Sequence, residues 1–105
     1  MKTITKNMKI GRNRGMARIW IENSTLAQYG FERGATISVD IEPNLIRIYA
    51  DQYGLREVAG RVRNGKAISI IDINNPELTT MVGDATTARI TYDGNGGAIL
   101  IEVIR

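Results

Sequence analysis

The stretch ARIWIENSTLAQYGFERGATISVDIEPNLIRIYA, residues 17–50, decides the fold because it reads as strand, short helix and hairpin in that order. Apolar and polar residues alternate over 16–22, which predicts a strand. A helix of about one turn is expected over 25–30. The alternation resumes over 35–42 and again over 45–50, and these two strands are expected to pair as a hairpin.

Local residue types support each of these elements. Ile19 and Ile21 share one face of the first strand, which predicts that this face is buried. Asn23 and Ser24 are good helix N-cap residues. Pro43, followed by Asn, supplies the tight turn between the two hairpin strands.

The same order of elements recurs in the second half of the chain. The segment KAISIIDI, 66–73, is rich in β-branched residues and reads as a strand. The segment PELTTM, 76–81, opens with proline and reads as a helical turn. Strands follow over 85–92 and 98–104, and the glycine-rich segment DGNGG, 93–97, is a strong hairpin turn signal.

We therefore expect a mainly β fold: a small pseudo-symmetric β-barrel with two short helical turns and an internal pseudo-twofold repeat, which the resemblance described below makes swapped-hairpin-like. A unit of this kind exposes an apolar face when alone, so two copies would pack together to close one core. Superimposing Gly34 on Gly83 aligns Ile19 with Ile68, Ile21 with Ile70, Val39 with Ala88 and Ile41 with Ile90. The chain is expected to be a single domain, 1–105, comprising a basic arm 1–15, repeat one 16–50, a connector or edge strand 51–65 and repeat two 66–105.

The first copy resembles the SymE-type members of the AbrB-like swapped-hairpin superfamily. Their pattern is a strand, then L-x-x-x-G-F-x-x-G, an alternating strand, a turn and a final L-x-I strand. The matching positions here are Leu26, Gly30, Phe31, Gly34, Ile37, Val39, Leu45, Ile46 and Ile48. The second copy resembles the broader AbrB pattern through Pro76, Glu77, Leu78, Gly83 and Asp84, but has no apolar residue at the position of Phe31.

This resemblance implies that the chain is similar to a fused dimer, because family members supply one copy per chain and dimerise through interlocked hairpins. Most are DNA-binding regulators, often antitoxins or transition-state repressors, and the SymE branch is associated with toxin function. The resemblance also implies nucleic-acid binding through arginines near the start of the first strand and in adjoining loops.

Composition excludes several other functions. The chain has no cysteine, so it has no disulfide, thiolate metal site or cysteine nucleophile. It has no histidine, the usual general base near neutral pH. We expect no catalytic residues, no enzyme activity, no metal and no cofactor. No apolar run approaches the length of about 18 residues that a membrane span needs, and we expect a cytoplasmic protein that does not bind membranes.

Charge is distributed unevenly along the chain. The formal net charge is +3, yet residues 1–18 contain six Lys and Arg and no acid, a pattern typical of segments that grip a phosphate backbone. A second basic cluster, which includes Arg56, precedes the second copy. The candidate nucleic-acid-binding residues are Lys6, Lys9, Arg12, Arg14, Arg18, Arg61, Arg63 and Lys66.

Each of these assignments has a structural alternative. The first 15 residues are equally typical of a solvated, frayed terminus. Arg61 and Arg63 also fit the solvent face of a strand. Trp20 and Tyr29 could stack on bases, but a single Trp in a small β domain more often packs in the core.

The sequence therefore leaves three functions open. The first is a DNA-binding regulator that uses its basic arm on duplex DNA. The second is a small phage or mobile-element protein that binds and inhibits a host protein complex. The third is a SymE-like RNA-binding toxin, and in each case a homodimer is compatible with the sequence.

Overall fold

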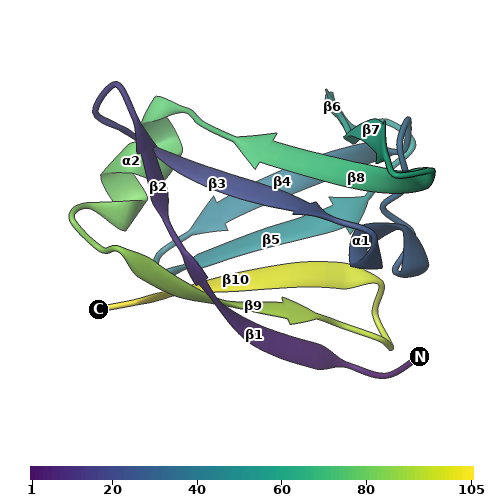
Figure 1. Cartoon of the computed structure of the whole chain (residues 1–105). Helices are drawn as coiled ribbons and strands as arrows, with labels where there is room; N and C mark the ends of the chain where they lie inside the picture. Colours follow the sequence, from purple (N-terminus) through teal and green to yellow (C-terminus); the bar gives the residue numbers. More distant parts are fainter.

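The computed structural model describes all 105 residues and contains ten strands and two helices (Figure 1). A mainly β fold, as predicted, is confirmed. In chain order the elements are β1 (Ile4–Lys9), β2 (Gly11–Asn13), β3 (Met16–Asn23), α1 (Thr25–Gln28), β4 (Thr36–Glu42), β5 (Leu45–Ala50), β6 (Arg56–Glu57), β7 (Ala59–Arg63), β8 (Lys66–Ile73), α2 (Pro76–Val82), β9 (Thr87–Tyr92) and β10 (Ala98–Ile104).

The strands form two sheets that face each other. The larger sheet has six strands in the order β1-β9-β10-β5-β4-β6, and the smaller has four in the order β2-β3-β8-β7. No strand ladder joins the two sheets into a closed barrel. The helices lie at opposite ends of the molecule, between the layers (Figure 1). Neither helix has the length and apolar character that a bilayer-spanning helix requires.

Alternation along the strands builds the core between the sheets. Ile19 and Ile21 of β3 are buried, as are Ile46 and Ile48 of β5. Their neighbours on the same strands point to solvent, as the period of two requires. Each fully buried large aliphatic side chain contributes about 1.5–3 kcal/mol of transfer free energy, and 22 buried hydrophobic residues form one continuous cluster. The core thus spans both sheets and both halves of the sequence.

Equivalent asparagines begin the two helices. The side-chain oxygen of Asn23 accepts a hydrogen bond from Leu26 N at 2.9 Å, and that of Asn75 accepts one from Leu78 N at 2.8 Å. Of the two predicted caps for α1, Asn23 therefore makes the bond, whereas Ser24 makes none. Both leucines are fully buried beneath their helices.

Strand pairing shows that the repeat extends over nearly the whole chain. The hairpin β2–β3 is matched by β7–β8, and β4–β5 by β9–β10. The edge pair β1–β9 is matched by β6–β4. The central pairs β3–β8 and β5–β10 each join one half to the other.

The residue correspondence differs from the one that the sequence predicted. Burial and capping match Ile19 with Ile71 and Asn23 with Asn75, whereas the predicted alignment paired Ile19 with Ile68. The error came from matching Gly34 to Gly83. Gly83 ends α2, while Gly34 N donates to Val58 O in a loop, so these glycines have different roles.

Two segments outside the predicted repeats belong to the sheets. Residues 1–15, expected as a basic arm, include β1 and β2, so this segment is neither an arm nor a frayed terminus. Residues 51–65, expected as a connector or a paired edge strand, include β6 and β7, which are edge strands of the two sheets. Ile10, where the chain passes from one sheet to the other, is buried, and its N–H donates to Thr86 O at 2.9 Å. Val58 makes the equivalent bond to Ala35 O at 2.9 Å in the second half.

Candidate nucleic-acid interface

The solvent face of the four-stranded sheet carries four of the eight predicted binding residues. We call it the outer face and define it by its charged and aromatic side chains opposite the core, namely Arg18, Trp20 and Glu22 of β3, Arg61 and Arg63 of β7, and Lys66 and Asp72 of β8. Alternation along each strand and the registers β3–β8 and β7–β8 place them on this one side.

Arg18 lies on the outer face near the β2–β3 end of the sheet. Its Nε and Nη2 donate to the two carboxylate oxygens of Asp72, at 2.9 and 3.0 Å. This hydrogen bonding raises the pKa of the Arg18 guanidinium. The guanidinium also lies 4.4 Å from the ring centroid of Trp20, in a cation–π arrangement. Arg18 is thus held in place while its positive charge is balanced by Asp72.

Trp20 is exposed on this face and is not a core residue. Its side chain is 43% accessible, and its Nε1 donates to Glu22 Oε1 at 3.0 Å. The expectation that a lone Trp packs in the core is therefore wrong. Side chains alternate along β3, so the burial of Ile19 and Ile21 places Trp20, which lies between them, on the solvent side.

Glu22 is the shared acid for two arginines. Its Oε2 makes an ion pair with Arg61 and lies 3.9 Å from Arg63 Nη2. In the β7–β8 register, Arg63 is directly opposite Lys66. Like charges at directly opposed positions of a sheet destabilise it. This end of the sheet therefore has three cations and a single carboxylate.

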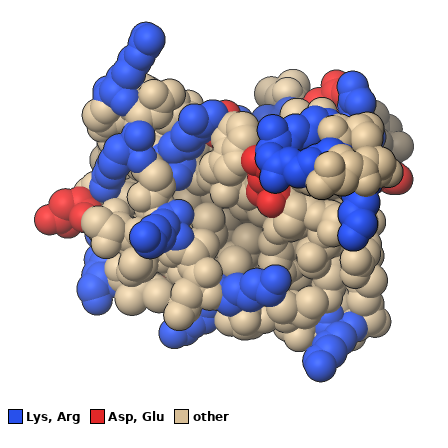
Figure 2. Space-filling model, viewed as in Figure 1, with Lys and Arg blue, Asp and Glu red and all other residues tan.

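The four-stranded sheet and its two hairpin turns concentrate positive charge. They hold six basic side chains (Arg12, Arg14, Arg18, Arg61, Arg63 and Lys66) and two acidic ones (Glu22 and Asp72). This excess of four is larger than the excess of three for the whole chain. Figure 2 shows basic side chains gathered over the β2–β3 end and over the β7–β8 end, with a hollow between them.

The two hairpin turns lie at opposite ends of the sheet because β3 and β8 are antiparallel. In the β3–β8 register, where Asn23 pairs with Ser69, the two turns are about 12 residues apart along the strands. At about 3.3 Å per residue, this corresponds to roughly 40 Å along untwisted strands. The longest dimension of the molecule is 36 Å. One turn of B-DNA spans about 34 Å, so the sheet is about as long as one helical turn of a duplex.

Arg12 does not belong to this surface. Its Nη2 donates to Gly83 O at 2.5 Å and to Ala85 O at 3.1 Å, which ties β2 to the loop that follows α2. The guanidinium thus satisfies carbonyl groups near the C-terminal end of that helix. In this structure Arg12 holds β2 against the loop after α2.

The remaining predicted residues are more dispersed. Arg14 is exposed in the β2–β3 turn, with φ of 56°. Lys6 of β1 lines a shallow hollow of about 220 Å³ together with Trp20 and Glu22, which places it beside the outer face. Lys9 is exposed opposite Thr87 on the other sheet. The fold thus brings Arg61, Arg63 and Lys66 together at the β7–β8 end of the outer face, with Arg18 and Arg14 toward the β2–β3 end, Lys6 beside the face and Lys9 on the other sheet.

Sequence reasoning missed the two acids that organise the outer face, Glu22 and Asp72. Asp72 reaches Arg18 only through the pairing of β3 with β8, across 54 positions of sequence. No local signal indicates that register. The alternation that places Ile19 and Ile21 inward does, however, place Trp20 and Glu22 on the outward side of β3. The outward position of Glu22 could therefore have been predicted from the sequence.

The structure shows no cluster of three or more metal-ligating side chains. Comparison of the chain with family models, curated proteins and solved structures finds no match.

Proposed function

We propose that this protein binds duplex DNA through the phosphate backbone, with the outer face of the four-stranded sheet as its contact surface, and acts as a DNA-binding regulator. The observation that carries the proposal is the β7–β8 end of the sheet. Arg61 and Arg63 share the single carboxylate of Glu22 there, and Lys66 lies directly opposite Arg63. A polyanion would relieve this repulsion and release its own condensed counterions.

The shape of the surface favours a duplex over a single strand. The two basic ends are separated by about one helical turn of DNA. Trp20 is the one exposed aromatic residue of the outer face, whereas proteins that bind single strands usually present several stacking platforms. Such a function agrees with the cytoplasmic location expected from the sequence.

The test is a titration of labelled duplex DNA, single-stranded DNA and RNA of equal length at several salt concentrations. We expect the duplex to bind most tightly, with an affinity that falls steeply as salt rises. The only Trp of the chain is Trp20, so its fluorescence should change on binding. Preference for RNA would indicate the RNA-binding alternative, and no binding to any nucleic acid at about 50 mM salt would contradict the proposal.

A matched pair of double variants locates the surface. Arg61→Ala/Arg63→Ala should weaken duplex binding and reduce the slope of log affinity against log salt by about two. Arg47→Ala/Arg89→Ala is the control. Both of its arginines make exposed ion pairs, with Glu42 and Glu102, on the other sheet. Equal loss in both variants would mean that binding depends on net charge and not on the outer face.

A further inference from the structure

The two halves differ in how the free edge of one hairpin is covered. In the first half, β1 pairs with β9 along six residues, from Ile4 opposite Tyr92 to Lys9 opposite Thr87. In the second half, β6 pairs with β4 at two residues only, Thr36 and Ile37. The remainder of that β4 edge, Ser38–Glu42, has no partner strand.

The connection between the halves explains this difference. The chain leaves β5 at Ala50, which lies opposite Ile37, and reaches β6 after five residues. The intervening turn is closed by Gly54 N donating to Asp51 O at 2.9 Å, and Asp51 N donates back to Thr36 O at 3.0 Å. After this short turn the chain pairs with β4 only at Thr36 and Ile37. No other segment of the chain pairs with the remainder of the β4 edge.

Beyond β1, residues 1–3 fill the space between α1 and the β9–β10 turn. Tyr29 of the α1 end donates its hydroxyl hydrogen to Lys2 O, and Gly94 N donates to Thr3 Oγ1 at 3.1 Å. The Met1 carbonyl packs so closely on Gly94 that a side chain there would overlap it. An extended segment is thus bound along an edge and into the adjoining groove.

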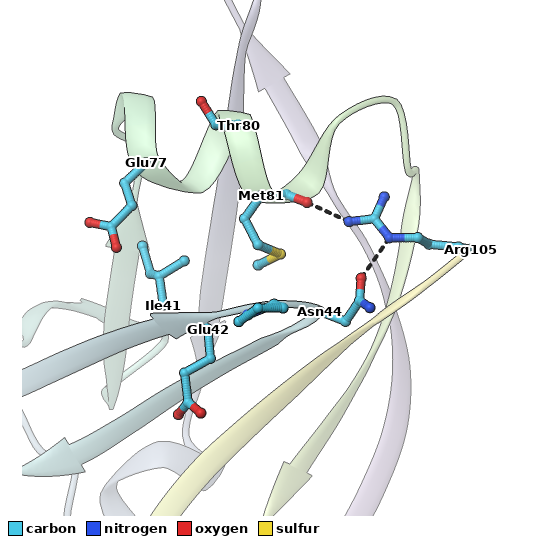
Figure 3. A pocket seen from close by; sticks show the side chains of 8 residues that line it. Ile41, Glu42, Asn44, Glu77, Thr80, Met81 and Arg105 are labelled. Atoms are coloured by element: carbon cyan, nitrogen blue, oxygen red, sulfur yellow. Dashed lines mark hydrogen bonds between the residues drawn. The ribbon is translucent and has the colours of Figure 1, made fainter.

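The equivalent groove in the second half is open. It has a volume of about 600 Å³ and lies between the β4–β5 turn and α2 (Figure 3). Ile41 and Met81 contribute its apolar surface, and the carboxylates of Glu42 and Glu77 flank it. Arg105 closes one side, where Nε donates to Asn44 Oδ1 at 2.6 Å and Nη2 donates to Met81 O.

The backbone at this edge is ready to accept a strand. Val58 N donates to Ala35 O, whereas Asp51 N donates to Thr36 O on the β5 side. Because backbone groups alternate in direction along a strand, Val39 and Ile41 direct their N–H and C=O groups away from β5, toward the open edge. An exposed edge of this kind is a template for strand addition.

We propose that the open edge of β4 and the adjoining groove bind an extended segment of a partner polypeptide, cationic and with apolar side chains at alternate positions. The chemistry of the occupant follows from the site. Asp40 and Glu42 are exposed on β4, and Glu77 lies across the groove. These three acids outnumber the two neighbouring arginines, Arg47, which pairs with Glu42, and Arg105, so positive charge is favoured at the rim. Ile41 and Met81 favour an apolar side chain between them.

The chain's own N-terminal segment illustrates such an occupant. Its sequence, MKTITKNM over residues 1–8, includes most of β1 and combines two lysines with Ile4 and Met8, which pack against the core. On β9, Lys6 lies opposite Ile90 and Asn7 opposite Arg89, so no acid of β9 faces this segment. The open edge of β4 carries the acids Asp40 and Glu42, so a cationic strand added there would have carboxylates beside it. This proposal does not rest on DNA binding, since it concerns the other sheet.

The experiment is an NMR titration of the isotope-labelled full-length protein with a synthetic peptide of residues 1–8, amidated at its C-terminus. We expect backbone amide shifts at 38–42 and 77–81, with new protection of the Val39 and Ile41 amides from hydrogen exchange. Glu77→Lys should weaken binding of the peptide at least about fivefold. Glu32→Lys, which reverses an exposed charge outside the groove, should not.

Three results would overturn the proposal. The first is the absence of shifts at millimolar peptide. The second is a set of shifts confined to 87–92, which would mean that the peptide only replaces β1. The third is a concentration-dependent dimer, measured by light scattering, that disappears when residues 1–3 are removed, because the occupant would then be a second copy of this chain. A thermal melt of Glu77→Lys confirms that this variant is folded.

Discussion

Asn23 and Asn75 occupy equivalent positions in the two halves, each accepting a hydrogen bond from the backbone N–H three residues later. They differ in one respect. Asn23 Nδ2 also donates to the hydroxyl oxygen of Tyr92, at 3.0 Å, and so links the start of α1 to the six-stranded sheet. A position that is purely a helix cap in one half is a cap and a link between layers in the other.

The two asparagines should therefore differ in their contribution to stability. Asn75→Ala is expected to lower the free energy of unfolding by about 1 kcal/mol, the usual cost of losing an N-cap. Asn23→Ala should cost about 1 kcal/mol more, because the half-buried Tyr92 hydroxyl loses a partner as well. Urea unfolding measures both, and equal losses would show that the bond to Tyr92 contributes nothing.

Arg12 and Arg14 are two positions apart but should respond differently to substitution. Arg12→Ala leaves Ala85 O without its side-chain partner and is expected to reduce stability by about 1–2 kcal/mol. Arg14→Ala, in an exposed turn, should change stability by less than about 0.5 kcal/mol. Chemical denaturation of the two single variants provides the comparison, with each serving as the other's control.

Lys66 is expected to lower the free energy of unfolding slightly and to contribute to the affinity for duplex DNA. It lies directly opposite Arg63, so Lys66→Ala removes a like-charge pair and should leave stability unchanged or raise it by a few tenths of a kcal/mol. The same change should lower duplex affinity and reduce the salt slope by about one. A variant that lost both stability and affinity would show that Lys66 is a structural residue of the hairpin.

Asp51 should make stability depend on pH in the acid range. The hydroxyl of Ser38 and the backbone N–H of Tyr53 donate to its carboxylate, at 2.7 and 2.9 Å, and lower its pKa. A lowered folded-state pKa stabilises the protein above the unfolded value of about 3.9, and this contribution disappears as pH falls through the folded value.

Unfolding of the wild type and of Asp51→Asn between pH 7 and pH 2 tests this sign. The difference in stability between the two proteins should be greatest near neutral pH and should shrink on acidification. A difference that is constant with pH would mean that the carboxylate charge is not involved. Ser38→Ala, which removes the larger cause of the lowered pKa, should reduce the pH-dependent part.

Elements with a strong local pattern were predictable from the sequence. The hairpin of β4 and β5 was expected over 35–42 and 45–50 and is found at Thr36–Glu42 and Leu45–Ala50. Its alternation and its Pro43–Asn44 turn lie within a few residues of each other, so local chemistry was sufficient. The start of α2 at Pro76, with Asn75 before it, was predictable for the same reason.

Elements defined by distant partners were not predictable. The segment ITKNMK of β1 has little alternation and becomes a strand because β9, more than 80 positions away, supplies a hydrogen-bonding edge. Its lysines were visible in the sequence, but its strand was not. The candidate interface was likewise half predictable: the cations were identified, whereas the acids that hold Arg18, Arg61 and Arg63 in position come from strand registers that only the fold defines.

The central pairs β3–β8 and β5–β10 cross between the two halves, and this has a consequence for synthesis on the ribosome. When the first half emerges, its β2–β3 and β4–β5 hairpins can form, but the inner edges of β3 and β5 have no partner because β8 and β10 are still to be translated. Long-range pairing of this kind delays folding. These two edges therefore stay open, or pair transiently with the first half of a neighbouring chain, until β8 and β10 become available.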